Sequence, residues 1–166
     1  MSILSPVQIA ELERAADSAL FCQKATQLPA DLTIAQWALE SGWGAHQPGN
    51  NCFGIKAYPG CYGVQWLHTF EVIAGVRSPV LKEFATFPSL ASCFAKHASL
   101  FTLGKPYAEA WARYLKTGDV ETLIRQIAPI YATDPNYADE LLRIRAMPEV
   151  EQSLKRESEV TTPKSE

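Results

Sequence analysis

A short, almost wholly apolar helix that ends in a glutamate constrains this chain more than any other feature. Residues 32–41 read LTIAQWALES, and on a helical wheel their apolar side chains cover more than half of the circumference. A helix this apolar must be buried, so we expect its narrow polar stripe of Thr33, Gln36 and Glu40 to face a cleft rather than bulk water. Gly42 ends the helix. The pattern therefore predicts a carboxylate held at the edge of a cleft.

Glu40 lies in the last turn of this helix, where the partial negative charge of the helix end disfavours a carboxylate. Trp37 and Trp43 are close in sequence and would exclude water from it. Both effects raise the pKa of Glu40, as a general acid that works near neutral pH requires. The plainer interpretation is a solvated glutamate at a frayed helix end. The surrounding sequence favours the acid.

Length and charge restrict the class of protein. A chain of 166 residues predicts one domain, over residues 1–150, with a polar and disordered tail at 151–166. A net charge of −3 and a pI near 5.7 argue against nucleic acid or an anionic membrane as partner. No apolar run reaches the length of a membrane span, and the N-terminus lacks the features of a secretory signal. We expect a monomer made in the cytoplasm and exported by another route.

The cysteines and histidines do not suggest a metal site. Cys22, Cys52, Cys61 and Cys93 contain no C-x-x-C pair, and the three histidines are scattered, so we expect neither metal nor cofactor. Cys52 and Cys61 flank a loop rich in Gly and Pro, and in an oxidising compartment they are expected to form a disulfide. Buried free thiols are the alternative.

Most of the chain has helical periodicity. Ser5 as N-cap and Pro6 predict the start of a first helix, before the Glu40 helix. Further helices are expected to start near Ser89, Pro106, Asp119 and Asn136.

Residues 64–87 differ, because β-branched and aromatic residues predominate there. Breaks at residues 74–75 and 78–79 divide this small antiparallel β region, and residues 53–56 are expected to add a first strand. The fold class is therefore α+β, mostly helical, with a cleft between a helical lobe and a small β lobe.

Four segments stand out when they are taken in order. They are QWALESGWG (36–44), NNCFGIKA (50–57), TFE (69–71) with FATFPS (84–89) and CF (93–94), and YATDPNYA (131–138). Together they resemble glycoside hydrolase family 73, which comprises peptidoglycan N-acetylglucosaminidases, including the wall-cutting domain of flagellar rod proteins. The resemblance covers about residues 28–146 and implies a lysozyme-like helical lobe, a β-hairpin lobe and peptidoglycan as substrate.

The resemblance implies three catalytic positions. Glu40 matches the family's acid, Glu71 its second carboxylate from the β lobe, and Tyr131 a tyrosine close to the acid. Glu71 could activate water, but the sugar's own 2-acetamido group could attack instead. Tyr131 would then orient the acetamido group or stabilise positive charge. Considered alone, Glu71 could equally be a surface strand residue, and Tyr131 a core tyrosine.

Sugar contacts are expected mainly from aromatic side chains, although ordinary packing explains each one equally well. Asn51 is expected to shape its loop through an Asx turn and to lie near the substrate. Family members often carry an arginine within the segment that reads FATF here, so contacts at that segment are in doubt. The expected substrate-binding residues are Trp43, Asn51, Phe53, Tyr58, Tyr62, Trp66 and Tyr137.

The leading hypothesis is a hydrolase of the β-1,4 bond between N-acetylglucosamine and N-acetylmuramic acid, acting as an antibacterial toxin or a phage-type lysin. As a toxin it would require an inhibitor protein that occupies the cleft. The alternatives are a lytic transglycosylase or muramidase, and a catalytically dead glycan-binding domain. No P-loop, G-x-S-x-G or G-x-G-x-x-G motif supports another reaction class.

Overall fold

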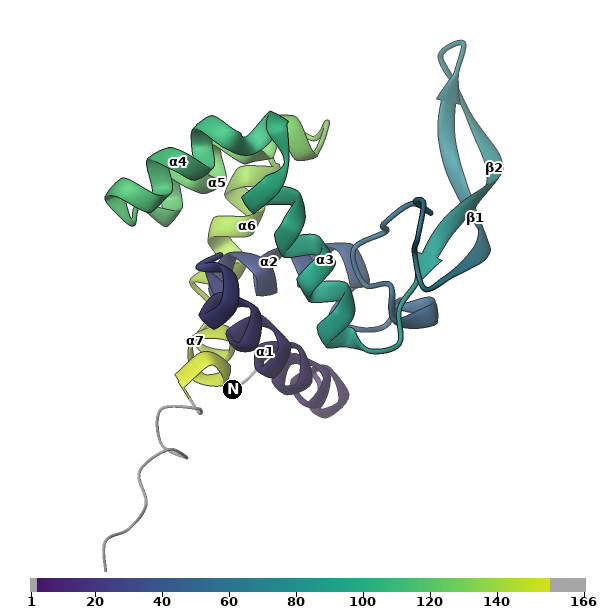
Figure 1. Cartoon of the computed structure of the whole chain (residues 1–166). Helices are drawn as coiled ribbons and strands as arrows, with labels where there is room; N and C mark the ends of the chain where they lie inside the picture. Colours follow the sequence, from purple (N-terminus) through teal and green to yellow (C-terminus); the bar gives the residue numbers. More distant parts are fainter. Residues whose placement is uncertain (1–2, 156–166) are drawn as a thin grey trace, which may run out of the picture.

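The computed structural model describes residues 3–155, which form a helical lobe from which one β-hairpin projects (Figure 1). This confirms the expected α+β, mostly helical fold. The elements in chain order are α1 (Pro6–Thr26), α2 (Ala30–Ser41), a 3-10 turn (Pro48–Asn50), β1 (Gly63–Ile73), β2 (Val76–Thr86), α3 (Leu90–Leu103), a second 3-10 turn (Lys105–Tyr107), α4 (Ala108–Thr117), α5 (Val120–Tyr131), α6 (Tyr137–Arg145) and α7 (Pro148–Lys155).

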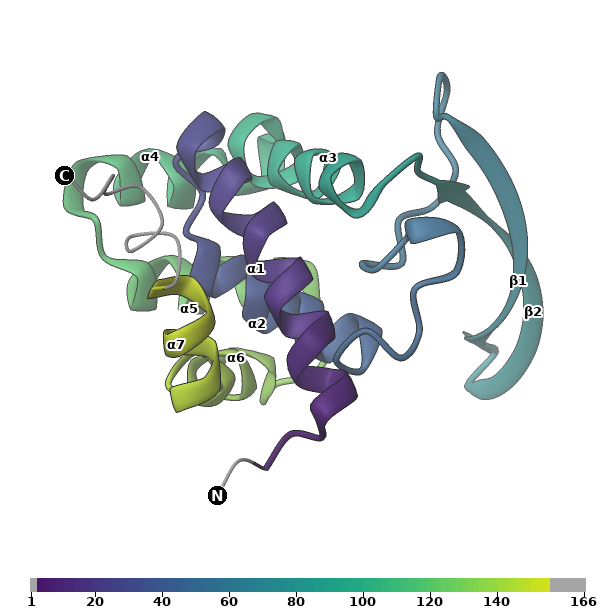
Figure 2. The ribbon, with the colours of Figure 1, turned by 90° about the horizontal axis from the view of Figure 1, so that it is seen from below.

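Helix α2 forms the centre of the core, as its apolar sequence predicts. Helices α1, α6 and α7 all contact it, and Figure 2 shows α1 crossing in front of it. Leu32, Ile34 and Trp37 are each 0% exposed, which removes their apolar surface from water and is the main stabilising contribution of this helix. Glu40 therefore projects from an element that packing holds on every side.

The expected helix starts are confirmed at three of the caps. Ser5 forms a capping box with Gln8, each side chain accepting a hydrogen bond from the other residue's backbone N–H. The side chains of Ser89 and Asp119 accept hydrogen bonds from the backbone N–H groups of the third residues of α3 and α5. The C-terminus of α2 is also as expected, because Gly42 has a φ of 59°, a left-handed conformation that glycine adopts without strain.

Helix α7 continues past the domain boundary that we placed at residue 150. The structure describes this helix as far as Lys155, and both Val150 and Ser153 are buried against the helical lobe. The remaining part of the expected disordered tail, residues 156–166, lies outside the described residues.

The β lobe is one antiparallel hairpin that pairs continuously from Gly63↔Thr86 to Ile73↔Val76. Its turn is the expected residue pair Ala74-Gly75, both with positive φ, at 50° and 80°. The expected break at Ser78-Pro79 is wrong, since β2 runs through it. A two-stranded sheet leaves one edge of each strand unpaired, so a proline without an N–H is tolerated there.

The expected strand at residues 53–56 is also wrong. Only an isolated bridge joins Lys56 to Phe84, flanked by the backbone hydrogen bonds Ala57 N–H to Glu83 O and Ala85 N–H to Ile55 O. Gly54 has a φ of 62°, which turns the chain away from an extended course. The loop therefore touches the hairpin at its base without lengthening the sheet.

The two faces of the hairpin differ in their surroundings. Gln65 donates a hydrogen bond to Pro48 O, and Lys56 lies over the ring of Phe84, so this face is turned toward the loop before the hairpin. Trp66 and Phe70 lie at positions of β1 that alternate with Gln65, so they belong to the opposite face, where they are 59% and 55% exposed. Within residues 3–155 no helix is both long and apolar enough to cross a bilayer.

Candidate active site

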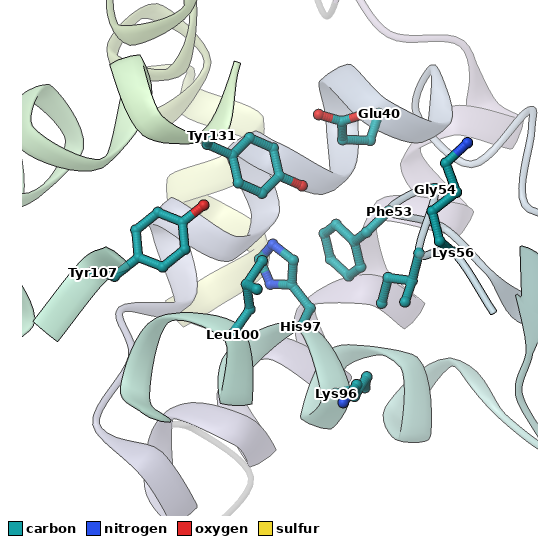
Figure 3. Close-up of a pocket in the computed structure, with 10 residues that line it drawn as sticks. Glu40, Phe53, Gly54, Lys56, Lys96, His97, Leu100, Tyr107 and Tyr131 are labelled. Carbon is teal, nitrogen blue, oxygen red and sulfur yellow. The ribbon is translucent and has the colours of Figure 1, made fainter. Parts of the chain in front are cut away.

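A pocket of about 430 Å³ opens beside the end of α2. Its walls come from α2, from the loop before the hairpin, from α3, from the 3-10 turn after α3 and from α5, so five separate segments of the chain meet there (Figure 3). The lining residues are Glu40, Phe53, Gly54, Ile55, Lys56, Lys96, His97, Leu100, Tyr107 and Tyr131.

Glu40 lines this pocket as the sequence predicts. The residue as a whole is exposed, but the protein beside its carboxyl group removes enough water to raise its pKa. Tyr137 donates a hydrogen bond to Glu40 Oε1 at 3.2 Å, which opposes this rise and is the weaker of the two effects. The carboxyl group is therefore both oriented and shifted toward the protonated form that a general acid needs.

Contrary to expectation, the other two residues of the polar stripe of α2, Thr33 and Gln36, do not face the pocket. Gln36 is 0% exposed and donates its Nε2 to the Tyr137 hydroxyl at 3.4 Å. Thr33 is 1% exposed and donates to Pro29 O at 3.0 Å. Of the three polar positions only Glu40 lines the pocket, while Gln36 supports the tyrosine that orients it.

The two tryptophans expected to desolvate Glu40 are not pocket residues. Trp37 is fully buried in the core, and Trp43 packs edge-on against it with ring centroids 6.2 Å apart. Trp43 follows Gly42 in the turn and itself has a φ of 59°. The pair packs the end of α2 and does not lie at the pocket wall.

Tyr131 ends α5 and faces the pocket, where Figure 3 shows its hydroxyl on the same side as Glu40. Its ring stacks on Tyr137 and on Phe101, with centroids 5.6 Å and 5.8 Å away. Burial, and next the charge of Glu40, raise its pKa well above the usual value, so the phenol stays protonated. Its hydroxyl has no hydrogen-bond partner among residues 3–155 and is therefore free to meet a substrate.

The expected turn after Tyr131 is present. Asp134 accepts hydrogen bonds from the backbone N–H of Asn136 at 2.8 Å and, through its own carbonyl, from that of Tyr137 at 3.2 Å. This turn brings Tyr137 from α6 under Tyr131. Tyr137 is 6% exposed and contacts Glu40 rather than lining the pocket, so it acts through the acid.

His97 and Phe53 form the inner wall, and sequence reasoning missed the histidine. Their rings stack with centroids 3.8 Å apart at an angle of 15°. His97 is 1% exposed and neither ring nitrogen has a hydrogen-bond partner among the described residues. Burial lowers its pKa to about 3, so the ring is neutral. Its one sequence signal, a place on the apolar face of α3, indicates core packing rather than a site.

Tyr107, Leu100, Lys56 and Lys96 are further lining residues that the sequence did not single out. Lys56 belongs to the FGIK segment and lies 4.3 Å over the Phe84 ring, while Lys96 lies 4.1 Å over the Tyr58 ring. The lysines add positive charge to the pocket, where Glu40 is the one acidic side chain among the described lining residues.

Asn51 holds the loop that carries Phe53. It is 5% exposed, and its amide donates to Ile55 O at 2.8 Å and to Ala85 O at 2.9 Å. Its Oδ1 accepts from the backbone N–H of Ile55 at 3.0 Å. Asn51 thus shapes its loop, but through hydrogen bonds to the residue four positions on rather than through the expected Asx turn. Both amide hydrogens are already used, which leaves none for a sugar.

The other expected aromatic platforms lie outside this pocket. Tyr62 is 74% exposed and Trp66 is on the outward face of the hairpin, while Tyr58 is partly buried beneath Lys96. Of the expected aromatic contacts, only Phe53 is among the lining residues, together with the catalytic candidate Tyr131.

Glu71 is on β1 opposite Ser78 and is not among the lining residues of the pocket. It shares the face of the hairpin that bears Gln65 and Phe84, which is the face toward the loop. Its carboxylate pairs with Lys82 at 3.2 Å, and both side chains are about two-fifths exposed, at 41% and 42%. An ion pair this exposed contributes little to stability.

The expected Cys52–Cys61 disulfide is not formed in the structure, where all four cysteines are free. Cys61 donates its thiol to Gly63 O at 3.4 Å, whereas the sulfur of Cys52 lies 3.6 Å from that of Cys93 on α3. Closeness in sequence suggested Cys61 as the neighbour of Cys52, but Cys93 is its neighbour in the structure because the loop folds back against α3. Among residues 3–155, no three His, Cys, Asp or Glu side chains gather to hold a metal ion.

A helical lobe with a protonatable carboxyl group at a pocket, beside a β-hairpin, is the arrangement of a lysozyme-like glycoside hydrolase. The family model for glucosaminidases, described as mannosyl-glycoprotein endo-beta-N-acetylglucosaminidase, matches residues 16–147. The chain belongs to this family, and the resemblance to glycoside hydrolase family 73 is confirmed.

Named relatives agree with this family. The chain is 34% identical over 122 residues to peptidoglycan hydrolase FlgJ of Salmonella typhimurium, covering 69% of this chain and 38% of the relative. It is 32% identical over 119 residues to exo-glucosaminidase LytG of Bacillus subtilis, covering 68% and 42%. A crystal structure of a peptidoglycan hydrolase mutant from Sphingomonas sp. A1 matches with a TM-score of 0.70 and 29% identity, over 89% of this chain and 99% of that one. The chain thus spans about two-fifths of the length of these two curated relatives.

Proposed function

We propose that this protein hydrolyses the β-1,4 bond between N-acetylglucosamine and N-acetylmuramic acid in peptidoglycan. The observation that carries the proposal is Glu40, an oriented carboxyl group with a raised pKa at the edge of a pocket. Such a group can protonate the oxygen of the leaving sugar. The names of the FlgJ and LytG relatives support peptidoglycan and a glucosaminide bond.

For the second half of the reaction we propose attack by the sugar's own 2-acetamido group. Tyr131 lines the same pocket as Glu40 and its hydroxyl has no partner in the described part of the chain, so it is placed to hold the acetamido group in position. Glu71 is not a lining residue and is paired with Lys82. Hydrolysis of the intermediate by water then returns the original anomeric configuration.

The test follows the sugar products. The full chain is incubated with purified peptidoglycan, and mass spectrometry identifies the new ends, while time-resolved NMR identifies the first-formed anomer. New reducing N-acetylglucosamine ends with retained configuration support the proposal. Anhydro-muramic ends would instead indicate a lytic transglycosylase, and reducing muramic ends a muramidase. An inverted anomer would indicate that Glu71 activates water. No new ends at all would indicate a glycan-binding domain.

As the biological role we propose wall lysis, by an antibacterial toxin or a phage-type lysin, with an inhibitor protein in the pocket if the role is that of a toxin. The support is the wall-hydrolase family alone. Directing the chain to the periplasm of a Gram-negative host should cause lysis, whereas the same chain without the export signal, or exported with Glu40→Gln, should not. Lysis by the exported Glu40→Gln chain would contradict an enzymatic role.

A further inference from the structure

Two cysteines far apart in sequence meet behind the inner wall of the pocket. Cys52 is 1% exposed in the loop before the hairpin, Cys93 is 0% exposed on α3, and their sulfurs are 3.6 Å apart. A disulfide has an S–S distance of about 2.05 Å, so the two atoms need to approach by less than 2 Å. The proposed hydrolysis uses neither cysteine.

The pair joins the two segments that form the inner wall. Phe53 directly follows Cys52, and His97 is one helical turn after Cys93, so the Phe53–His97 ring stack joins the same loop and helix. Phe94 adds an edge contact to Phe53 at 5.0 Å. The hairpin at residues 63–86 lies wholly between the two cysteines in sequence, so a bond between them would close the chain at the base of the β lobe.

We propose that Cys52 and Cys93 are a disulfide site, oxidised when the protein folds in contact with a small-molecule disulfide, and that the bridge fastens the β lobe to α3. The thiolate of one of the two cysteines attacks the oxidant's disulfide and expels one thiolate. The sulfur of the other cysteine then attacks the protein sulfur of the mixed disulfide, loses its proton and expels the second thiolate. Two protein thiols are oxidised and one small disulfide is reduced to two thiols.

Both sulfurs are buried in the folded protein, so the oxidant reaches them before the loop docks on α3, during folding. Docking of the loop then brings the second sulfur to the mixed disulfide and completes the bond. In the docked state without the bond, hydrogen bonding from the Cys52 thiol and from the backbone N–H groups of Cys52 and Phe53 lowers the pKa of Cys93, whereas burial raises the pKa of Cys52.

Mass spectrometry tests the pairing directly, because trypsin cuts after Lys24, Lys56, Arg77, Lys82 and Lys96 and leaves each cysteine in a different peptide. The full chain is refolded with reduced and oxidised glutathione, alkylated under denaturing conditions and digested. We expect one cross-linked pair, joining the peptides of Cys52 and Cys93, with Cys22 and Cys61 alkylated. A Cys52–Cys61 pair, or four alkylated cysteines, would overturn the proposal.

Variants test the effect on the fold. Oxidation should raise the Tm of the wild-type chain by roughly 5 °C or more. The matched control Cys61→Ser should keep this rise, and Cys93→Ser should abolish it. If Cys93→Ser does not fold, the Cys22→Ala/Cys61→Ser variant retains only the proposed pair. It should show two titratable thiols when reduced and none after oxidation, and two remaining thiols would refute the site.

The bridge does not depend on the proposed hydrolysis. The Glu40→Gln variant should form the same cross-linked peptide pair and show the same rise in Tm. An inactive protein that forms the bridge, or an active protein that does not, separates the two proposals.

Discussion

The helical lobe and the hairpin each contribute a candidate catalytic carboxylate, and the two lie in very different surroundings. Glu40 is itself an exposed residue, yet it accepts a hydrogen bond from a buried tyrosine and has a raised pKa because the protein removes water from its carboxyl group. Glu71 is 41% exposed and its charge is met by an equally exposed lysine. The buried Tyr137 orients the first group before any substrate arrives, whereas the second is oriented only by a solvent-screened ion pair.

The two lobes also differ in how firmly they hold their side chains. Tight packing around Tyr131, Tyr137 and His97 gives groups with shifted pKa values, and the hydrogen bond from Tyr137 ties the exposed Glu40 to this cluster. The hairpin has an open outer face with exposed aromatic residues, which is the face turned away from the loop that lines the pocket. We infer that the chemistry depends on the helical lobe.

The largest expected effect is that of Glu40→Gln, which should lower kcat by about 10²–10⁴ because an amide cannot deliver a proton. Loss of turbidity of purified wall sacculi measures this. In the wild type, activity should fall as the pH rises through the raised pKa of Glu40, since the acid form is then lost.

The unfolding temperature of the same variant shows whether it is correctly folded. A raised carboxyl pKa means that the stability contributed by protonated Glu40 is lost as the pH rises through the folded-state pKa. Glu40→Gln should therefore unfold at the same temperature as the wild type or a higher one at neutral pH. Activity above about a tenth of wild type in a folded variant would remove Glu40 as the acid.

The comparison between the lobes is tested most directly by Tyr131→Phe against Glu71→Gln. Removing the Tyr131 hydroxyl should lower kcat by about 10²–10³, the usual cost of one positioned hydrogen-bond donor. Glu71→Gln, the matched change on the hairpin, should cost less than about tenfold. If Glu71→Gln were as damaging as Glu40→Gln and Tyr131→Phe mild, the hairpin would share the chemistry.

His97 should make the helical lobe sensitive to acid. Because its pKa falls to about 3 on folding, its contribution to stability is present above the unfolded value of about 6.5 and decreases as the pH falls toward 3. We expect about 3 kcal/mol of unfolding free energy to be lost between pH 7 and pH 4 from this residue alone. Tyr131, the titratable ring beside it, stays protonated throughout.

Urea unfolding at several pH values measures this effect. His97→Phe keeps an aromatic ring against Phe53 and should flatten the acid dependence, while His68→Gln on the exposed face of the hairpin should leave it unchanged. An unchanged acid dependence in His97→Phe would show that His97 is not buried as a neutral ring.

The smallest effect is expected on the hairpin. Single and double replacement of Glu71 and Lys82 by glutamine should reveal a coupling of less than about 1 kcal/mol, since both side chains are exposed. Thermal unfolding of the four proteins provides the value. A coupling above about 2 kcal/mol would mean that this pair is held as firmly as the groups in the pocket.

Local sequence was a good guide wherever one segment determines its own structure. The apolar run of α2, its Gly42 end, the Ser5, Ser89 and Asp119 caps and the Ala74-Gly75 turn are all present as expected. Each depends on propensity, capping or periodicity within a few residues. The candidate acid was found because it lies on such a segment, in a motif that resembles one family.

Prediction failed where a residue's role depends on a distant neighbour. Tyr137 meets Glu40 across 97 positions, and Cys52 meets Cys93 across 41. The sequence placed His97 on an apolar helix face, which indicates an ordinary core residue. It lines the pocket because the loop packs Phe53 against it.

The sequence by itself determined the helices up to α6, the hairpin, the family and the carboxylate at the end of α2, because backbone propensity and hydrophobic periodicity act within one segment. It did not predict α7. Only the tertiary structure decided which tyrosine orients that carboxylate, which histidine is buried neutral and which cysteines meet. Those outcomes depend on burial and on contacts between segments far apart in the chain. How much water a side chain loses, and how far its pKa shifts, is set only when the whole core is packed.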